Sequence, residues 1–311
     1  MKALIDAIIA KDNPSVVGLD PKPALIPPIL LNGARTVRDV AEAYFAFNIA
    51  IIDAVYDIVP AVKPQIAMYE ALGPAGLDVY VRTNEYAQTR GLYVLGDIKR
   101  GDIGSTATAY AAHIEGTPSI NGVGSTDVWH EDAVTVNPYL GSDGILPFVQ
   151  AANNSNKDIF VLVKTSNPSS NELQDLRVDG FAHTVATQVA ELVEQWGENS
   201  RANKYGYSRV GAVVGATHPV LGAQLRTLMP HTFFLVPGYG AQGGTADDLA
   251  GLFDENGLGA LINSSRGIIG AWKHTDEAET IRTELQALNL VATSARQAAL
   301  AMKNDIARVR A

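Results

Sequence analysis

One stretch of the chain, LYVLGDIKRGDIGSTATAYAAHIEG at residues 92–116, contains the unit from which the fold is predicted. It opens with a short apolar run, Leu92–Asp97, which is typical of a strand buried on both faces of a parallel sheet. Polar and glycine residues follow, and the segment Ser105–Glu115 then has helical periodicity. The stretch therefore predicts one strand followed by one helix, the repeating unit of α/β proteins.

The same kind of apolar run recurs along the chain. The predicted strands are Ser15–Leu19, Ile58–Lys63, Leu92–Asp97, Ala133–Asn137, Asp158–Lys164, Arg209–Gly215, Thr232–Val236 and Gly259–Asn263. The predicted helices are Lys2–Lys11, Thr36–Asp57, one that starts near Pro74 and ends before Gly91, Ser105–Glu115, Gly144–Ala152, Phe181–Trp196, Val220–Leu228, Ala246–Glu255 and Asp276–Arg308. Strands that alternate with helices in this way predict a (β/α)8 TIM barrel with an extra N-terminal helix. We expect a single domain over residues 1–311, with an open doubly wound sheet as the alternative architecture.

The composition narrows the classes of protein to consider. The 311 residues are 47% hydrophobic and 18% charged, which suffices for a large core and argues against general disorder. The net charge of −9 makes a nucleic-acid partner unexpected. The chain has no cysteine, and its six histidines lack metal-ligand spacing, so we expect no metal site. No apolar run is long enough to span a membrane and no signal peptide is evident, so we expect a cytoplasmic protein.

Two polar segments interrupt the alternation of strands and helices. Gly116–Ser125 and Glu198–Tyr207 are both rich in small or polar residues. Neither is long enough to separate two domains. We interpret both as irregular insertions on the surface.

Catalytic residues of a barrel lie where its strands end, so the polar residues at those positions are the candidates. They are Asp20, Lys63, Asp97, Lys99, Asn137, Lys164, Thr165, Ser166, Thr217, His218, Pro237–Gly243 and Asn263–Arg266. Asp97 and Lys99 are two residues apart and so share one face of a strand, whereas Ile98 points the other way. With Asp102 and Lys63 they predict a cluster of opposite charges that is in place before substrate arrives. The alternative is a structural ion-pair network that closes the barrel mouth.

A second cluster follows the seventh and eighth predicted strands. Residues 237–244 read PGYGAQGG and contain GxGxxG, but this motif binds dinucleotides only after the first strand of a Rossmann unit. Loops at this place in a barrel commonly bind phosphate through backbone N–H groups. Arg266, in the segment Ser264–Gly267, supplies a cation that can grip phosphate with two hydrogen bonds. The alternative is a flexible turn beside an ordinary surface arginine.

These motifs together resemble the orotidine 5′-monophosphate decarboxylase family. Asp97, Lys99, Asp102, Ile103 and Thr106 match the signature DxKxxDIxxT, and the string KRGDIGST at residues 99–106 is similar to the longer bacterial branch. Further matches are Asp20 in GLDP, Lys63 in VKPQ, Ser166 in TSNP, and the phosphate-end residues Pro237, Gln242 and Arg266. Ile98 departs from the pattern, because many relatives have alanine there.

The resemblance implies a function and a partner. It implies conversion of orotidine 5′-monophosphate to UMP and CO2 in de novo pyrimidine biosynthesis, with no cofactor. Lys99 is then the proton donor to C6, Asp97 lies near the substrate carboxylate, and Lys63 and Asp102 orient and charge-balance Lys99. Ser166 meets the pyrimidine. It also implies a homodimer in which Asp102 and Thr106 reach into the partner's site.

Two other functions remain open at this point. A 3-hexulose-6-phosphate synthase shares the Asp-x-Lys-x-x-Asp core and uses a metal, although the Ser166 and Gln242 motifs argue against it. A non-catalytic phosphate binder is a different class of protein. It has no reason to keep Lys63, Asp97, Lys99 and Asp102 together with Asp20.

Overall fold

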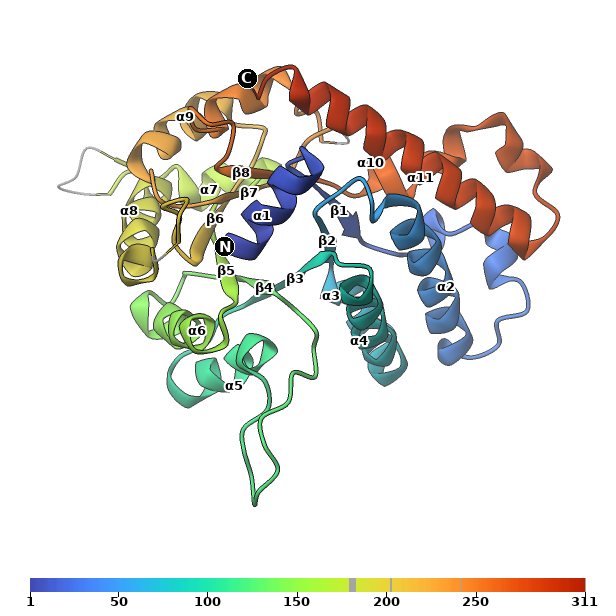
Figure 1. Ribbon diagram of the computed structural model, residues 1–311, viewed down its shortest axis with the longest axis horizontal. Helices are drawn as coiled ribbons and strands as arrows, with labels where there is room; N and C mark the ends of the chain where they lie inside the picture. Colours follow the sequence, from blue (N-terminus) through green and yellow to red (C-terminus); the bar gives the residue numbers. More distant parts are fainter. Residues whose placement is uncertain (179–182, 202, 241, 311) are drawn as a thin grey trace.

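The strands form a closed parallel barrel in the computed structural model, which describes residues 1–178, 183–201, 203–240 and 242–310 (Figure 1). In order around the barrel they are β1 (Ser15–Leu19), β2 (Ala61–Pro64), β3 (Tyr93–Arg100), β4 (Ala133–Val136), β5 (Asp158–Lys164), β6 (Val210–Val214), β7 (Phe234–Val236) and β8 (Ala260–Ser264). Pairing of β1 with β8, with Val16 opposite Asn263, closes the barrel. The predicted (β/α)8 TIM barrel is confirmed, and the open doubly wound sheet is excluded.

Helices surround this barrel. They are α1 (Lys2–Lys11), α2 (Val37–Val55), α3 (Ile66–Glu70), α4 (Gly73–Thr89), α5 (Gly104–Glu115), α6 (Ser142–Ser155), α7 (Asn171–Gln174), α8 (Val185–Gly197), α9 (Pro219–Leu228), α10 (Arg266–Ile269) and α11 (Glu284–Ala307). Short 3-10 helices occur at Pro23–Leu25, Pro28–Leu31, Pro168–Ser170, Glu198–Ser200, Asp247–Leu252, Ala271–His274 and Asp276–Thr280. Among the helices of the described residues, none combines the length and hydropathy that crossing a bilayer requires.

Helix α1 closes one end of the barrel. Its buried side chains Leu4, Ile5 and Ile8 pack in one apolar cluster with residues near the starts of the strands, such as Val16 and Tyr93. Figure 1 looks onto this end and shows α1 lying across the ring of strands. Because this end is filled with apolar side chains, the opposite end, where the strands finish, is the one left for a ligand.

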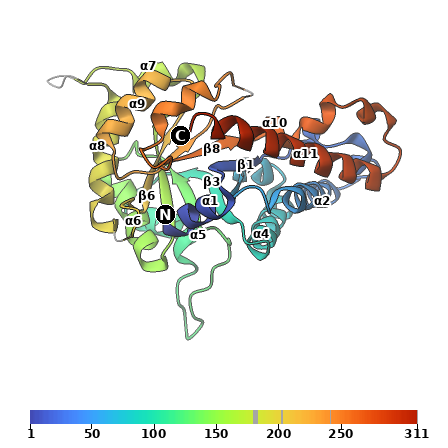
Figure 2. The ribbon, with the colours of Figure 1, turned by 45° about the horizontal axis from the view of Figure 1, so that its top comes forward.

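Helices α2 and α11 lie side by side and extend away from the barrel (Figures 1 and 2). Each begins at a threonine that forms a capping box, Thr36 with Asp39 and Thr283 with Gln286. The Arg296 guanidinium on α11 donates to Asp57, just beyond α2, at 2.7 and 2.8 Å. The C-terminal helix is thereby held against the first half of the chain.

A cluster of buried polar side chains packs against β3 at Gly96. Glu131 is fully buried, accepts a hydrogen bond from the Tyr80 hydroxyl, and has His113 Nδ1 at 2.8 Å from its Oε2. The His113 ring stacks on Trp129 with 4.2 Å between ring centroids. A Cβ at Gly96 would lie 2.0 Å from Glu131 Oε1, so the lack of a side chain at Gly96 makes room for this carboxylate. The cluster therefore packs directly against the residue that precedes Asp97.

Several predicted boundaries are wrong. The second strand begins at Ala61 and not at Ile58, because Pro60 has no N–H to donate to a neighbouring strand. The helix predicted at Ala246–Glu255 is a 3-10 helix, Asp247–Leu252. The helix predicted at Asp276–Arg308 is interrupted by extended backbone at Ile281 and Thr283, where the capping box starts α11. The predicted start of Phe181–Trp196 lies outside the described residues, and α8 begins at Val185.

The two polar insertions differ from one another. Residues near 116–130 project from the barrel (Figure 1), and Ile120 and Val123 form an antiparallel bridge. Asn121 and Gly122 between them have φ of 51° and 84°, as a tight two-residue hairpin turn requires. In the second insertion, Tyr207 is buried and its hydroxyl donates to Asp254 at 2.6 Å. The prediction of a surface segment is therefore wrong at Ser200, which is also buried, and at Tyr207, whose aromatic ring packs into the core at the α1 end.

Candidate active site

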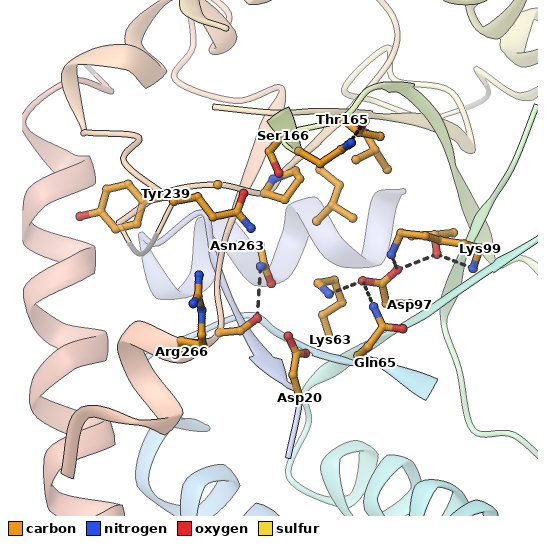
Figure 3. Close-up of a pocket in the computed structure, with 18 of the residues that line it drawn as sticks. Asp20, Lys63, Gln65, Asp97, Lys99, Thr165, Ser166, Tyr239, Asn263 and Arg266 are labelled. Atoms are coloured by element: carbon orange, nitrogen blue, oxygen red, sulfur yellow. Dashed lines mark hydrogen bonds and ion pairs between the residues drawn. The ribbon is translucent and has the colours of Figure 1, made fainter. Parts of the chain in front are cut away.

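A cavity of about 470 Å³ opens where the barrel strands end (Figure 3). Its apolar floor includes Leu162, Val213 and Leu235, which lie inside β5, β6 and β7. Polar side chains surround it, from Asp20 after β1 round to Arg266 after β8. Residues that follow the first and the last strand of the barrel therefore contribute to one site.

The structure brings most of the predicted site residues together. Those that line the cavity are Asp20, Lys63, Asp97, Lys99, Ser166, Pro237, Gln242 and Arg266. Four other strand-end candidates, Asn137, Lys164, Thr217 and His218, are not among the lining residues. Lys164 is fully buried and instead donates to Asp175 at 2.6 Å. A strand end alone was therefore too broad a criterion.

Asp102 and Thr106 lie outside this cavity. Asp102 is half-buried, and its Oδ1 accepts a hydrogen bond from the N–H of Ile103 at 2.8 Å. Thr106 is exposed in the first turn of α5. Neither residue completes the site of its own chain.

Asp97 is the centre of the charged cluster. It is 6% exposed, and its Oδ2 accepts from Lys63 Nζ at 2.5 Å and from Gln65 Nε2 at 3.0 Å. Its Oδ1 accepts from Lys99 Nζ and, at 3.0 Å, from the Thr135 hydroxyl. Each oxygen of the carboxylate therefore has two donors, and these fix its orientation in the cavity (Figure 3).

The two lysines differ in exposure. The side chain of Lys63 is 5% exposed and that of Lys99 is 44% exposed. Lys63 therefore belongs to the buried framework of the site, whereas the ammonium of Lys99 is open to a ligand in the cavity.

Buried charge is tolerated here because the opposite charges are close together. Burial alone would raise the pKa of Asp97, but Lys63 and Lys99 outweigh burial and hold that pKa well below its usual range. Burial alone would lower the pKa of Lys63, but Asp97 and Asp20 outweigh it, so that the pKa lies above its ordinary value. Asp97 and Lys63 are therefore both charged at neutral pH.

Two residues that line the cavity each have a buried oxygen without a hydrogen-bond partner among the described residues. These oxygens are Oδ1 of Asp20 and Oδ1 of Asn263. A buried acceptor that lacks a donor is costly unless a ligand or water supplies one. The arrangement suits a ligand with hydroxyl groups between β1 and β8.

The other side of the cavity contains Tyr239 and Arg266, across from Asp97 and Lys99 (Figure 3). The glycine-rich segment after β7 turns back on itself, with the N–H of Gly244 donating to the carbonyl of Gly238 at 3.1 Å. Gly238 has a φ of 102°, and a Cβ there would lie 3.1 Å from the Cβ of Ser166. Ala241 of the GxGxxG match lies outside the described residues.

The strand-end criterion did not single out Gln65 or Thr135. Gln65 is two residues beyond Lys63, and this alternation was a usable signal. Thr135 lies inside β4, before the strand end, so no positional signal marked it. Among the described residues, no three His, Cys, Asp or Glu side chains come together as a possible metal-binding group.

Comparison with known protein families agrees with this geometry. The model of the family described as orotidine 5′-phosphate decarboxylase / HUMPS matches residues 16–281. The chain belongs to this family. Family membership, expected from the DxKxxDIxxT signature, is thus confirmed.

Its relatives within the decarboxylase family cover nearly the whole chain. An orotidine 5′-phosphate decarboxylase from Rhodopirellula baltica is 47% identical over 272 residues, which are 87% of this chain and 88% of that protein. One from Petrotoga mobilis is 40% identical over 299 residues, 96% of this chain and 95% of that protein. The solved structure of the Leishmania donovani OMP decarboxylase, 31% identical, has a TM-score of 0.73 and covers 99% of this chain and 97% of that one.

Proposed function

We propose that this chain converts orotidine 5′-monophosphate to UMP and CO2, a step of de novo pyrimidine biosynthesis, without a cofactor. One barrel domain over residues 1–311 carries the activity. The observation that carries the proposal is the cluster of Lys63, Asp97 and Lys99, which is preorganised in a cavity at the open end of the barrel. The names of the relatives support the same reaction.

The reaction needs a cation beside one carbon atom. When the bond between C6 of the pyrimidine and its carboxylate carbon breaks, CO2 leaves and the electron pair stays on C6, in the plane of the ring. The π-system cannot absorb this charge, so a fixed ammonium is the stabilising group. We assign this role to Lys99, which then transfers a proton from Nζ to C6 and later regains one from water.

Asp97 and Lys63 prepare Lys99 for this step. Asp97 holds the ammonium of Lys99 in the cavity and lies near the substrate carboxylate, which its negative charge disfavours before CO2 is released. Lys63 keeps Asp97 ionised despite burial. The two lysines and the aspartate thus act as one unit.

The rest of the cavity binds the remainder of the nucleotide. The unpartnered oxygen of Asp20 accepts a hydrogen bond from a ribose hydroxyl. Ser166 contacts the pyrimidine, and Pro237, Gln242 and Arg266 of the cavity lining hold the phosphate. Of these three, Arg266 lies across the cavity from Lys99 (Figure 3). Binding at this remote phosphate supplies energy for the segments around the site to close over it.

Asp102 and Thr106 act in the site of a second copy of the chain. Both lie outside the cavity of their own chain. The side chains of Ile103, Tyr139 and Leu140 near them are 52%, 78% and 46% exposed. Large apolar residues exposed near these two positions are what an interface with a second copy would cover. We therefore assign a homodimer, with the Asp102 and Thr106 of each subunit contributed across the interface.

A turnover assay tests the reaction. The loss of orotidine monophosphate absorbance is followed with wild type, Lys99→Ala and Lys2→Ala, a lysine with a 60% exposed side chain at the opposite end of the barrel. Wild type and Lys2→Ala should form UMP and CO2, and Lys99→Ala should lose nearly all turnover. A wild type that leaves the substrate unchanged overturns the function. A Lys99→Ala variant that retains most of its rate overturns the role of Lys99.

Mixing two inactive variants tests the shared site. Lys99→Ala and Asp102→Ala subunits that exchange at random form heterodimers with one intact site, so the mixture should regain about a quarter of the wild-type rate. Each variant alone should stay inactive. A mixture as inactive as its components would place Asp102 outside the partner's site.

A further inference from the structure

The backbone at Lys99 has an unusual conformation. Its φ is 46°, in the left-handed region that side chains other than glycine rarely adopt. The pairing of β3 with β4 shifts register between Gly96 and Arg100, so the strand bulges at this place. A bulge re-aims the side chains it carries, and here it includes the half-exposed lysine of the cavity. Something outside β3 must hold this conformation.

One side chain of the neighbouring strand contacts this bulge at two points. Thr135 in β4 is 1% exposed. Its Oγ1 accepts a hydrogen bond from the backbone N–H of Lys99 at 2.9 Å and donates one to Asp97 Oδ1 at 3.0 Å. The hydroxyl thus donates its one proton to the Asp97 carboxylate and accepts the Lys99 N–H with a lone pair. The same Asp97 oxygen also accepts from Lys99 Nζ.

We propose that Thr135 is a positioning residue of the reaction, which sets the direction of the Lys99 ammonium through its contacts with the Lys99 backbone and the Asp97 carboxylate. A single oxygen atom, Thr135 Oγ1, is hydrogen-bonded both to the left-handed backbone of Lys99 and to the Asp97 carboxylate, which in turn accepts from Lys99 Nζ. Without the hydroxyl, the N–H of Lys99 loses its partner, Asp97 loses one of its four donors, and the bulge can relax. The ammonium then lies away from C6. This role rests on the function proposed above.

Thr135 is among the residues that line the cavity, but at 1% exposure it offers a ligand little surface to contact. Asp97 retains Lys63 and Gln65 on its other oxygen when the hydroxyl is removed. The phosphate end of the cavity lies across from Lys99 and is untouched (Figure 3). Loss of the hydroxyl should therefore lower kcat and leave KM nearly unchanged.

Three variants test the proposal by steady-state kinetics. Thr135→Val keeps the side-chain shape and removes the hydroxyl, and kcat should fall about 10- to 100-fold with KM within about threefold. Thr135→Ser keeps the hydroxyl and should retain kcat within about threefold. Thr232→Val is the control. It removes another fully buried hydroxyl, which lies outside the cavity lining and donates a hydrogen bond of 2.8 Å to Glu194. This variant should lower Tm while leaving kcat intact.

The outcomes separate the two claims. Wild type that turns over substrate while Thr135→Val keeps its kcat overturns the positioning role and leaves the function in place. A Thr135→Ser variant as slow as Thr135→Val also overturns it, because the hydroxyl is then not the group that matters. If wild type does not decarboxylate, the proposed function fails. A crystal structure of Thr135→Val then still decides the positioning, since an unchanged left-handed Lys99 overturns it.

Discussion

Replacing Asp97 with asparagine should destabilise the fold as well as stop the reaction. Lys63 is 4% exposed and its Nζ lies 2.5 Å from Asp97 Oδ2, so the variant leaves a buried ammonium beside a neutral amide. Removing one partner of a buried ion pair costs about 3–5 kcal/mol. Asp20 also acts on Lys63 electrostatically and compensates in part. We therefore expect a loss of about 3 kcal/mol in the free energy of unfolding at pH 7.

The destabilisation should depend on pH in a defined direction. The pKa of Asp97 is lowered in the folded protein, so its ionisation stabilises the fold above the unfolded pKa of about 3.9. This contribution is lost as the pH falls toward the folded pKa, and wild type should lose about 1 kcal/mol of it by pH 3. The pKa of Lys63 is raised, so its contribution persists until the pH rises past 10.5. The difference between wild type and variant is therefore largest between about pH 5 and 10.

Urea unfolding followed by tryptophan fluorescence at pH 7, 5 and 3 measures this difference. Lys99→Met is the matched control, because its side chain is 44% exposed and its removal should cost less than about 1 kcal/mol. An Asp97→Asn variant within about 1 kcal/mol of wild type at pH 7 would refute the assignment of a buried framework pair. A difference that is equally large at pH 3 would refute the electrostatic cause.

Three further outcomes are expected. Arg266→Ala should weaken substrate binding and raise KM at least tenfold, and added guanidinium should restore part of the activity. An unchanged kcat/KM would show that Arg266 does not bind the substrate. Gly96→Ala should lower stability by about 1–3 kcal/mol in thermal unfolding, because its Cβ would lie 2.0 Å from Glu131 Oε1. Gly101→Ala is the control and should cost less, because the nearest atom to its Cβ would be 3.3 Å away. Equal losses of stability in the two variants would contradict this explanation. Turnover should survive EDTA, and a loss that a divalent cation reverses would favour the metal-dependent synthase.

The sequence predicted the barrel and most of the cavity for one physical reason. Strands buried on both faces are continuous apolar runs, and their ends are marked by charged residues such as Asp20, Lys63 and Asp97. Ile98 also packs in the main core, as alternation along β3 predicts. Apolar runs and the charged residues at their ends are local patterns, so a single amino-acid sequence is enough to recognise them.

The parts that could not be predicted depend on neighbours. Alternation placed Asp97 and Lys99 on one face, but a bulge and a left-handed φ at Lys99 determine how they meet. The role of Thr135 depends on the register between β3 and β4, which no residue pattern specifies. Spacing alone grouped Asp102 with Asp97 and Lys99, whereas in the fold it lies outside the cavity, as the family resemblance implied.

The closure of the barrel by its first and last strands also has a consequence for biosynthesis. Asp20 follows β1 and Arg266 follows β8, and the Trp272 indole N–H donates to the carbonyl of Leu25, 247 residues earlier in the chain. At about 5–20 residues per second, a ribosome needs roughly 12–50 s to make the intervening chain. During that interval β1 has no β8 to pair with, and its apolar edge is open to other chains. A nascent chain therefore cannot complete the cavity until β8 and Arg266 have been made, late in synthesis.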